Sequence, residues 1–152
     1  MVKKISNRKN EDRVIAEVKT VLNKAYWLDQ EVKTKTNQLE ELRSLAEYVG
    51  SQTDEVKVKG STAGGHDTSV DRIIKKEKSI NVSVKALTRE RDRIEKLIKR
   101  VPDDRLRILL ELRYLEYCPW AAIAQRLHYD TRYVYRLHRQ AQLEVGKIMG
   151  IR

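Results

Sequence analysis

The chain has 152 residues, a net charge of +10 and 36% charged residues, with two Pro, one Cys and no Phe. This length suffices for one domain or two small ones, and the charged composition suits long, exposed helices. A single Cys excludes an internal disulfide, the absence of a long apolar run excludes a membrane span, and the positive charge favours an anionic partner.

A long amphipathic helix is predicted over residues 1–50, because apolar residues recur at alternating steps of three and four. Lys35 alone interrupts the stripe, and the seven-residue spacing is typical of a coiled-coil seam. We expect Tyr26 and Trp27 to pack within this helix and Gly50 to end it. The stripe consists of Val14, Val18, Val21, Ala25, Leu28, Val32, Leu39, Leu42, Ala46 and Val49.

A flexible linker is predicted over 51–69, where Gly, Ser and Thr predominate, and a second heptad helix over 70–101. Pro102 ends this helix. We expect the heptad helices to make the protein a homo-oligomer, while an antiparallel hairpin within one chain would bury the same stripe. The second stripe consists of Val70, Ile73, Ile80, Val84, Leu87, Ile94, Ile98 and Val101, with polar breaks at Glu77 and Arg91.

Three short helices are predicted over 102–152. Asp103 is expected to cap the first, over 104–116, and the Thr131 hydroxyl to cap the third, which runs to about Ile148. The second and third are joined by a tight turn at 128–130, a spacing that fits a helix-turn-helix. The inner face of the first helix is expected to carry Ile108, Leu109, Leu112 and Leu115.

The third helix is expected to read double-stranded DNA. At about 100° per residue its apolar residues Val134, Leu137, Ala141, Val145 and Ile148 share the inner face, with Leu143 outward and His138 partly buried. Arg binds guanine and Gln binds adenine in the major groove, whereas hydroxyls suit phosphates. Trp120 is expected to pack against the second helix. The predicted DNA contacts are Arg126, Thr131, Arg132, Tyr133, Tyr135, Arg136, Arg139 and Gln140.

Residues 105–143 resemble region 4 of bacterial sigma-70-type factors through the RILLELRY, IAQRL and TRYVYRLHRQA segments. The whole chain, including AYWLDQEVKTKTNQLEELRSLAEYV at 25–49, is also similar to phage late-gene activators of the ArpU/RinA-like group. This resemblance implies activation of phage late genes through contact with host RNA polymerase. Two positions depart from the region 4 pattern: His128 stands where Gly is usual, and Cys118-Pro119 where a Ser or Thr cap is usual. No segment resembles region 2, so a complete sigma factor is not expected.

Two other functions fit the same pattern. A phage small terminase also joins a helix-turn-helix to oligomerising helices, and a coiled-coil protein with a basic surface would bind an acidic protein instead of DNA. We expect no enzyme activity, cofactor or metal, because His66, His128, His138 and Cys118 fit no zinc spacing. The single Cys and the lack of an apolar segment after the basic opening residues indicate a cytoplasmic protein without membrane association.

Overall fold

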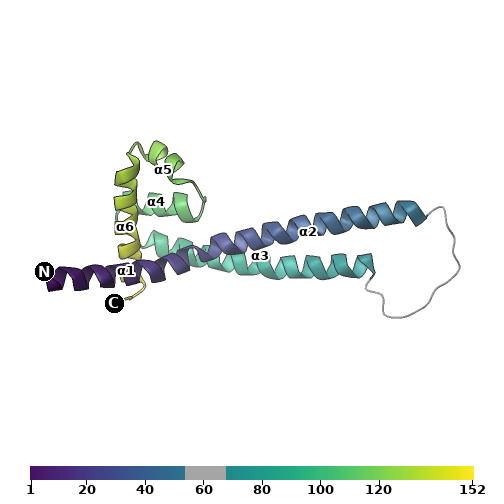
Figure 1. Cartoon of the computed structure of the whole chain (residues 1–152), viewed down its shortest axis with the longest axis horizontal. Helices are drawn as coiled ribbons and strands as arrows, with labels where there is room; N and C mark the ends of the chain where they lie inside the picture. Colours follow the sequence, from purple (N-terminus) through teal and green to yellow (C-terminus); the bar gives the residue numbers. More distant parts are fainter. Residues whose placement is uncertain (54–67) are drawn as a thin grey trace. The chain divides into compact units, whose positions relative to one another are not determined.

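The computed structural model describes residues 1–53 and 68–152, and every regular element in these ranges is a helix (Figure 1). The predicted all-α fold is thereby confirmed. Residues 51–53 of the expected linker continue a helix, while most of the linker, with His66, lies outside the described residues. The helices are α1 (Val2–Leu22), α2 (Lys24–Thr53), α3 (Ser69–Lys99), α4 (Asp104–Tyr114), α5 (Trp120–Leu127) and α6 (Thr131–Ile148).

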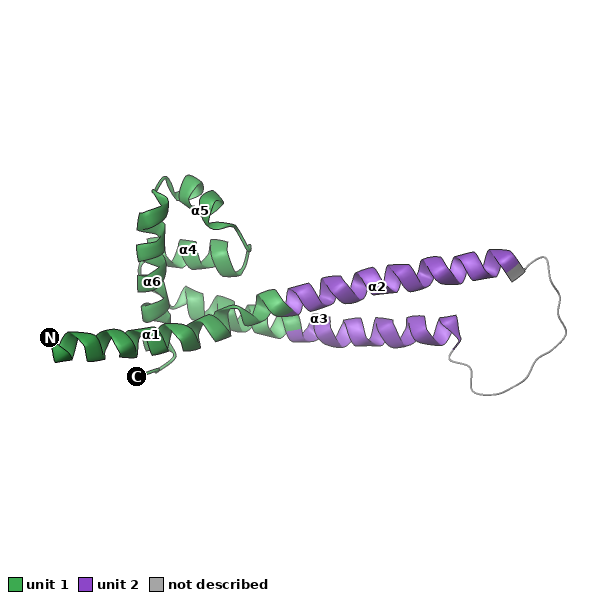
Figure 2. Ribbon diagram, in the orientation of Figure 1, with its two compact units in different colours: residues 1–27, 87–152 green, residues 28–86 purple. Residues whose placement is uncertain are grey.

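The chain divides into two compact units (Figure 2). Unit 1 contains residues 1–27 and 87–152, and unit 2 contains residues 28–86. These units do not follow the predicted domains 1–50, 51–69, 70–101 and 102–152. The difference arises because α1 packs against α6, which places the first helix of the chain in the same unit as the last three.

The predicted helix over 1–50 is two helices. Asn23 separates them, although its backbone keeps right-handed helical angles (φ −79°, ψ −9°) and its N–H still donates to the Lys19 carbonyl oxygen at 2.9 Å. The prediction that Gly50 ends the helix is wrong, because α2 continues to Thr53. A Gly inside a helix costs only about 1 kcal/mol relative to Ala, which neighbouring helical residues offset.

Unit 2 is a hairpin in which α2 and α3 run antiparallel (Figure 2). Arg43 forms an ion pair with Glu77 at 2.7 Å, and Lys35 donates to the Ser83 hydroxyl at 2.8 Å. The two helices thus pair within one chain, and two of the polar breaks in the heptad stripes, Lys35 and Glu77, lie opposite partners on the other helix. Of the apolar stripe within this unit, only Leu39 is buried; Val49, Val70 and Val84 are exposed, since one neighbouring helix covers one side only.

The core of unit 1 gathers residues from α1, the end of α3, and α4 to α6. Val18, Leu22, Ile94, Ile98 and Val101 are fully buried, together with the inner face of α6. Two predicted packing positions are wrong: Ile108 is 43% exposed and Trp27 is 66% exposed. On α4 the buried positions are Leu106, Leu109, Leu110, Leu112 and Tyr114, since the face that packs against α5 and α6 leaves Ile108 outside.

Candidate nucleic-acid interface

The turn between α5 and α6 places a non-glycine residue in the left-handed region. His128 has φ 57° and ψ 40°, and Tyr129 N–H donates to the Ala124 carbonyl oxygen at 3.0 Å. This bond from the second residue after a helix to its last turn is the Schellman closure, which usually employs Gly. His tolerates the left-handed conformation better than β-branched residues do, so the expected helix-turn-helix connection forms without Gly.

The cap of α6 is Asp130, not Thr131 as predicted. Asp130 has extended backbone angles and its Oδ1 accepts from Tyr133 N–H at 2.7 Å, whereas Thr131 is the first helical residue and is exposed. A carboxylate here also interacts favourably with the positive end of the helix dipole. The expected cap at the start of α4 is confirmed, since Asp103 accepts from Arg105 N–H at 2.9 Å.

The predicted inner face of α6 is confirmed at Val134, Leu137, Ala141 and Val145, all of which are buried. Burial extends beyond the apolar stripe to His138 and Gln142. His138 Nε2 lies 2.7 Å from the Tyr114 hydroxyl, and Trp120 packs edge-on against its ring. Burial, with help from the charges of Lys19 and Arg113, lowers the pKa of His138 to about 4, and burial raises the pKa of Tyr114 to about 12.

The outer face of α6 presents two exposed arginines near its beginning. Arg132 and Arg136 are both exposed, and the Arg136 guanidinium lies 5.7 Å from the centre of the Tyr133 ring. Tyr135 is 50% exposed and packs against Trp120, with ring centres 5.2 Å apart. These residues share one end of the helix with Thr131, as the sequence predicts for a helix that enters the major groove.

Arg139 differs from the other two predicted arginines. Its guanidinium donates to Asp12 Oδ1 and to Glu11 Oε2, both at 3.0 Å, so it ties α6 to α1. The two carboxylates raise the pKa of Arg139 further above its ordinary value. Arg139 is therefore not a free outward cation as expected: its side chain is 42% exposed but is paired with carboxylates of α1, which comes from the other end of the sequence.

The remaining predicted contacts lie in small polar clusters. Arg126 forms an exposed ion pair with Glu116 at 2.9 Å, and Gln140 is exposed on the third turn of α6. Arg105 donates to the Tyr133 hydroxyl at 3.1 Å. Arg105 is not among the contacts predicted from the sequence; its position two residues after the Asp103 cap, at the exposed start of α4, is the signal that could have identified it.

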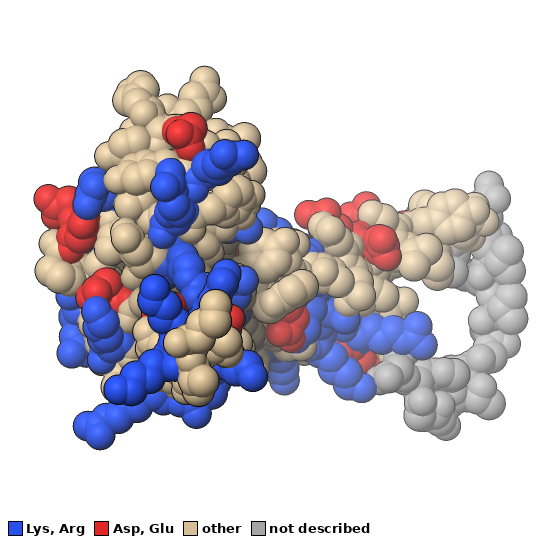
Figure 3. Space-filling view, turned by 60° about the vertical axis from the view of Figure 1, so that its left-hand side comes forward, with Lys and Arg blue, Asp and Glu red and all other residues tan. Residues whose placement is uncertain are grey.

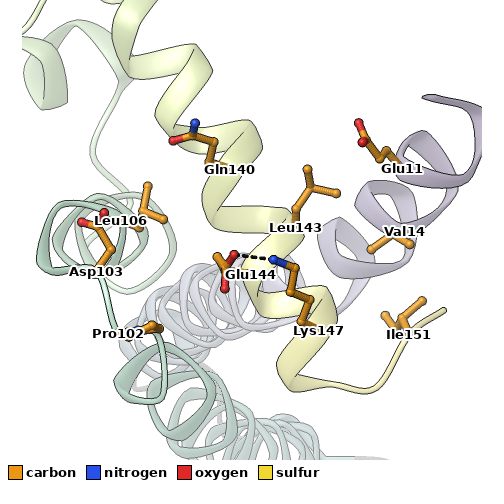
Figure 4. Close-up of a pocket in the computed structure, with 10 residues that line it drawn as sticks. All are labelled: Glu11, Val14, Pro102, Asp103, Leu106, Gln140, Leu143, Glu144, Lys147 and Ile151. Carbon is orange, nitrogen blue, oxygen red and sulfur yellow. Dashed lines mark hydrogen bonds and ion pairs between the residues drawn. The ribbon is translucent and has the colours of Figure 1, made fainter. Parts of the chain in front are cut away.

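A cavity of about 600 Å³ adjoins the far half of α6, between α1 and the beginning of α4 (Figure 4). Leu143, on the outer face of α6, lines it together with Val14 and is partly buried, so this residue packs against another helix. Three carboxylates, those of Glu11, Asp103 and Glu144, also line the cavity. Each of the three is paired with a cation, Glu11 with Arg139, Asp103 with Arg105 and Glu144 with Lys147. The arginines of α6 that are exposed and unpaired among the described residues lie in its first half, which we take as the candidate interface.

In residues 1–53 and 68–152, no three His, Cys, Asp or Glu side chains gather as metal ligands would. Across the same ranges no helix has both the length and the apolar character needed to cross a bilayer. Comparisons with protein-family models, curated proteins and solved structures gave no match to this chain.

Proposed function

We propose that the protein is a sequence-specific DNA-binding regulator that reads the major groove with the first half of α6. The observation that carries this proposal is the pair of exposed arginines, Arg132 and Arg136, at the start of a helix held by a helix-turn-helix connection. A guanidinium forms two hydrogen bonds with guanine O6 and N7, a pattern that no other base pair presents at that position.

Neighbouring groups suit the phosphate backbone. The Tyr133 hydroxyl accepts from Arg105 and therefore keeps its own proton available for a phosphate oxygen. Thr131 offers a second hydroxyl in the first turn of α6, and Arg126 a further cation at the end of α5. The contacts to phosphates would orient α6, and those to base edges would supply specificity.

The biological role follows from the resemblance to phage late-gene activators. We infer that the bound sites are promoter elements and that the protein acts beside the RNA polymerase of the host. A net charge of +10 supports binding to DNA and implies an affinity that falls as salt rises.

The decisive experiment selects duplexes bound by the intact chain, first from a randomised library and then from sheared phage DNA. We expect a defined sequence motif, with Arg132→Ala or Arg136→Ala each weakening its binding by about 1–3 kcal/mol and relaxing the preference at one or two base pairs. Lys147→Ala, which removes an exposed cation near the far end of the same helix, should leave the motif and the affinity unchanged.

Circular dichroism of each variant checks that the helices remain. A chain that binds no duplex in preference to others, or full affinity in both arginine variants, would refute the assignment of α6. Genomic fragments that cluster at one packaging site instead of at promoters would refute the regulatory role.

A further inference from the structure

The beginning of α1 packs against nothing in its own unit. Residues 1–10 are all exposed although residues 2–10 are helical, and they contain Lys3, Lys4, Arg8 and Lys9 but no acidic residue. None of these four cations forms an ion pair with another residue in the described ranges. Residues 2–10, which we call the projecting segment, therefore present unopposed positive charge on a regular helix.

The projecting segment extends on the side of α6 opposite to α4 and α5 (Figure 1). α1 reaches the outer face of α6 at Arg139, so the projecting segment leaves α6 from that face. Lys and Arg side chains gather on this side of unit 1 when it is turned forward (Figure 3). Both surfaces thus offer positive charge to one ligand.

Contacts between α1 and α6 fix the direction of the projecting segment. Glu11 and Asp12 bind Arg139, and Val14 lies so close to Gly146 that no side chain would fit there. Because Arg139 pairs with both Glu11 and Asp12, its positive charge offsets one of these two negative charges. The segment is therefore oriented by the recognition helix and not by a loose connection.

Helical periodicity determines which cations face the space beside α6. Measured from the direction midway between Glu11 and Asp12, Lys4 and Arg8 lie within about 30°, while Lys3 and Lys9 lie more than about 100° away. At 1.5 Å per residue, Lys4 is about 12 Å along the axis from Asp12. Among the cations of the projecting segment, Lys4 and Arg8 are thus the two on the side that carries Glu11 and Asp12, the partners of Arg139 on α6.

We propose that Lys4 and Arg8 bind phosphates of the duplex that α6 reads, so that α1 is a second DNA contact. Double-stranded DNA is the partner that this surface favours, because its phosphates repeat at regular intervals along a rod. One duplex can therefore present phosphates to α6 and to the projecting segment together. The contact would add affinity and extend the footprint without reading sequence. This inference rests on the proposed function.

The test compares two double variants that each remove two positive charges from the projecting segment. Lys4→Gln with Arg8→Gln alters the side toward α6, and Lys3→Gln with Lys9→Gln alters the other side; Gln preserves helix propensity. Binding of the selected duplex and of an unrelated duplex is measured by fluorescence anisotropy as salt is varied. For the first double variant we expect the slope of log K against log salt to fall by about 2, equally for both duplexes, because each lost phosphate contact removes roughly 0.9.

The control double variant should keep the wild-type slope. An equal loss in both double variants would show a general charge effect and overturn the orientation, and an unchanged slope in the first would overturn the contact. Failure of the proposed function looks different: the wild-type chain binds neither duplex, or Arg132→Ala and Arg136→Ala bind as it does.

Discussion

His138 is a titratable residue in the core of unit 1, on the helix that we propose reads DNA. Its ring lies between Tyr114 and Trp120, with the Tyr114 hydroxyl at 2.7 Å. Because burial lowers its pKa to about 4 from the ordinary 6.5, the folded chain keeps this ring neutral where an unfolded chain would protonate it. The fold is therefore sensitive to acid at one identifiable side chain.

The sign of the pH effect follows from proton binding. Between pH 6.5 and 4 the unfolded state binds a proton at residue 138 that the folded state does not, so stability is full above pH 6.5 and falls as the pH drops. We expect this residue to lower the free energy of unfolding by about 3 kcal/mol between pH 7 and 4. Urea titrations across this range measure the loss.

His138→Gln removes the titrating group and should flatten the pH dependence over that interval, although the variant is itself less stable. The interpretation fails if His138→Gln loses stability with acid as steeply as the wild-type chain does.

Single residues also show where sequence patterns succeed. A proline, then an Asp, then a helical pattern predict a cap at Asp103, and the structure confirms that this side chain caps α4. For α6 the prediction named Thr131, whereas the cap is its neighbour Asp130, which also has a side-chain oxygen beside the start of the helix. Their backbone angles decide between them, and a local pattern does not fix those angles to within one residue.

At the level of elements, the packing of α1 on α6 depends on a glycine. A Cβ atom at residue 146 would overlap Val14 Cγ1 and meet Val18 Cγ2 at 3.5 Å. The two helices approach this closely because residue 146 has no side chain. Gly146 is thus required by a neighbouring helix and not by its own backbone, which is helical.

Gly146→Ala should destabilise unit 1 by about 1–3 kcal/mol, the usual cost of overpacking, even though Ala favours a helix over Gly by about 1 kcal/mol. Gly50→Ala is the matched control, since no atom lies within 4 Å of its added Cβ, and it should be neutral or slightly stabilising. Thermal unfolding followed by circular dichroism distinguishes the two.

Val14→Ala in the Gly146→Ala background should recover part of the loss, because it removes the Cγ atom that the new methyl group meets. If Gly146→Ala is as stable as the wild-type chain, the close approach of α1 and α6 is not present in solution.

Helical periodicity predicted the buried stripe of α6 and the exposed arginines at its start, because those faces depend only on spacing along one helix. It could not predict that Arg139 is paired, since its partners, Glu11 and Asp12, lie more than a hundred positions earlier in the sequence. Trp27 lies outside the heptad stripe, and the pattern does not say whether a neighbouring helix reaches such a position; here the side chain is 66% exposed.

For the whole molecule, unit 1 is built from two separate stretches of the chain, 1–27 and 87–152, which determines which fragments can fold. The predicted domain 102–152 lacks α1 and the end of α3, which contribute Val18, Leu22, Ile94 and Ile98 to the same buried cluster. About 50 residues also lie near the lower limit for an independently stable fold. The helix-turn-helix is consequently part of a larger core.

A fragment of residues 102–152 should therefore show little cooperative unfolding at temperatures where the intact chain is folded. A chain in which 28–86 is replaced by a short flexible connector retains every core helix of unit 1 and should unfold cooperatively. Calorimetry of both proteins tests this. A sharp transition in the short fragment would show that α1 and α3 are dispensable for the fold.

The all-helical class and the arrangement of long helices before short ones followed from composition and periodicity alone. The division into units could not be predicted, because contacts between the first and last helices decide it. Heptad spacing does not show whether the partner helix is near in sequence, far away or on another molecule.

The pairing of α1 with α6 also determines when unit 1 can complete its fold during synthesis on the ribosome. α1 leaves the exit tunnel early, with Val14, Val18 and Leu22 still lacking the helix that covers them, while the antiparallel hairpin needs only residues already synthesised. Unit 1 is completed only after α6 has emerged, so a nascent chain stalled before residue 131 lacks the helix that covers the apolar stripe of α1. Contacts of such long sequence separation form slowly, so this chain depends most on chaperones in the interval between the emergence of α1 and that of α6.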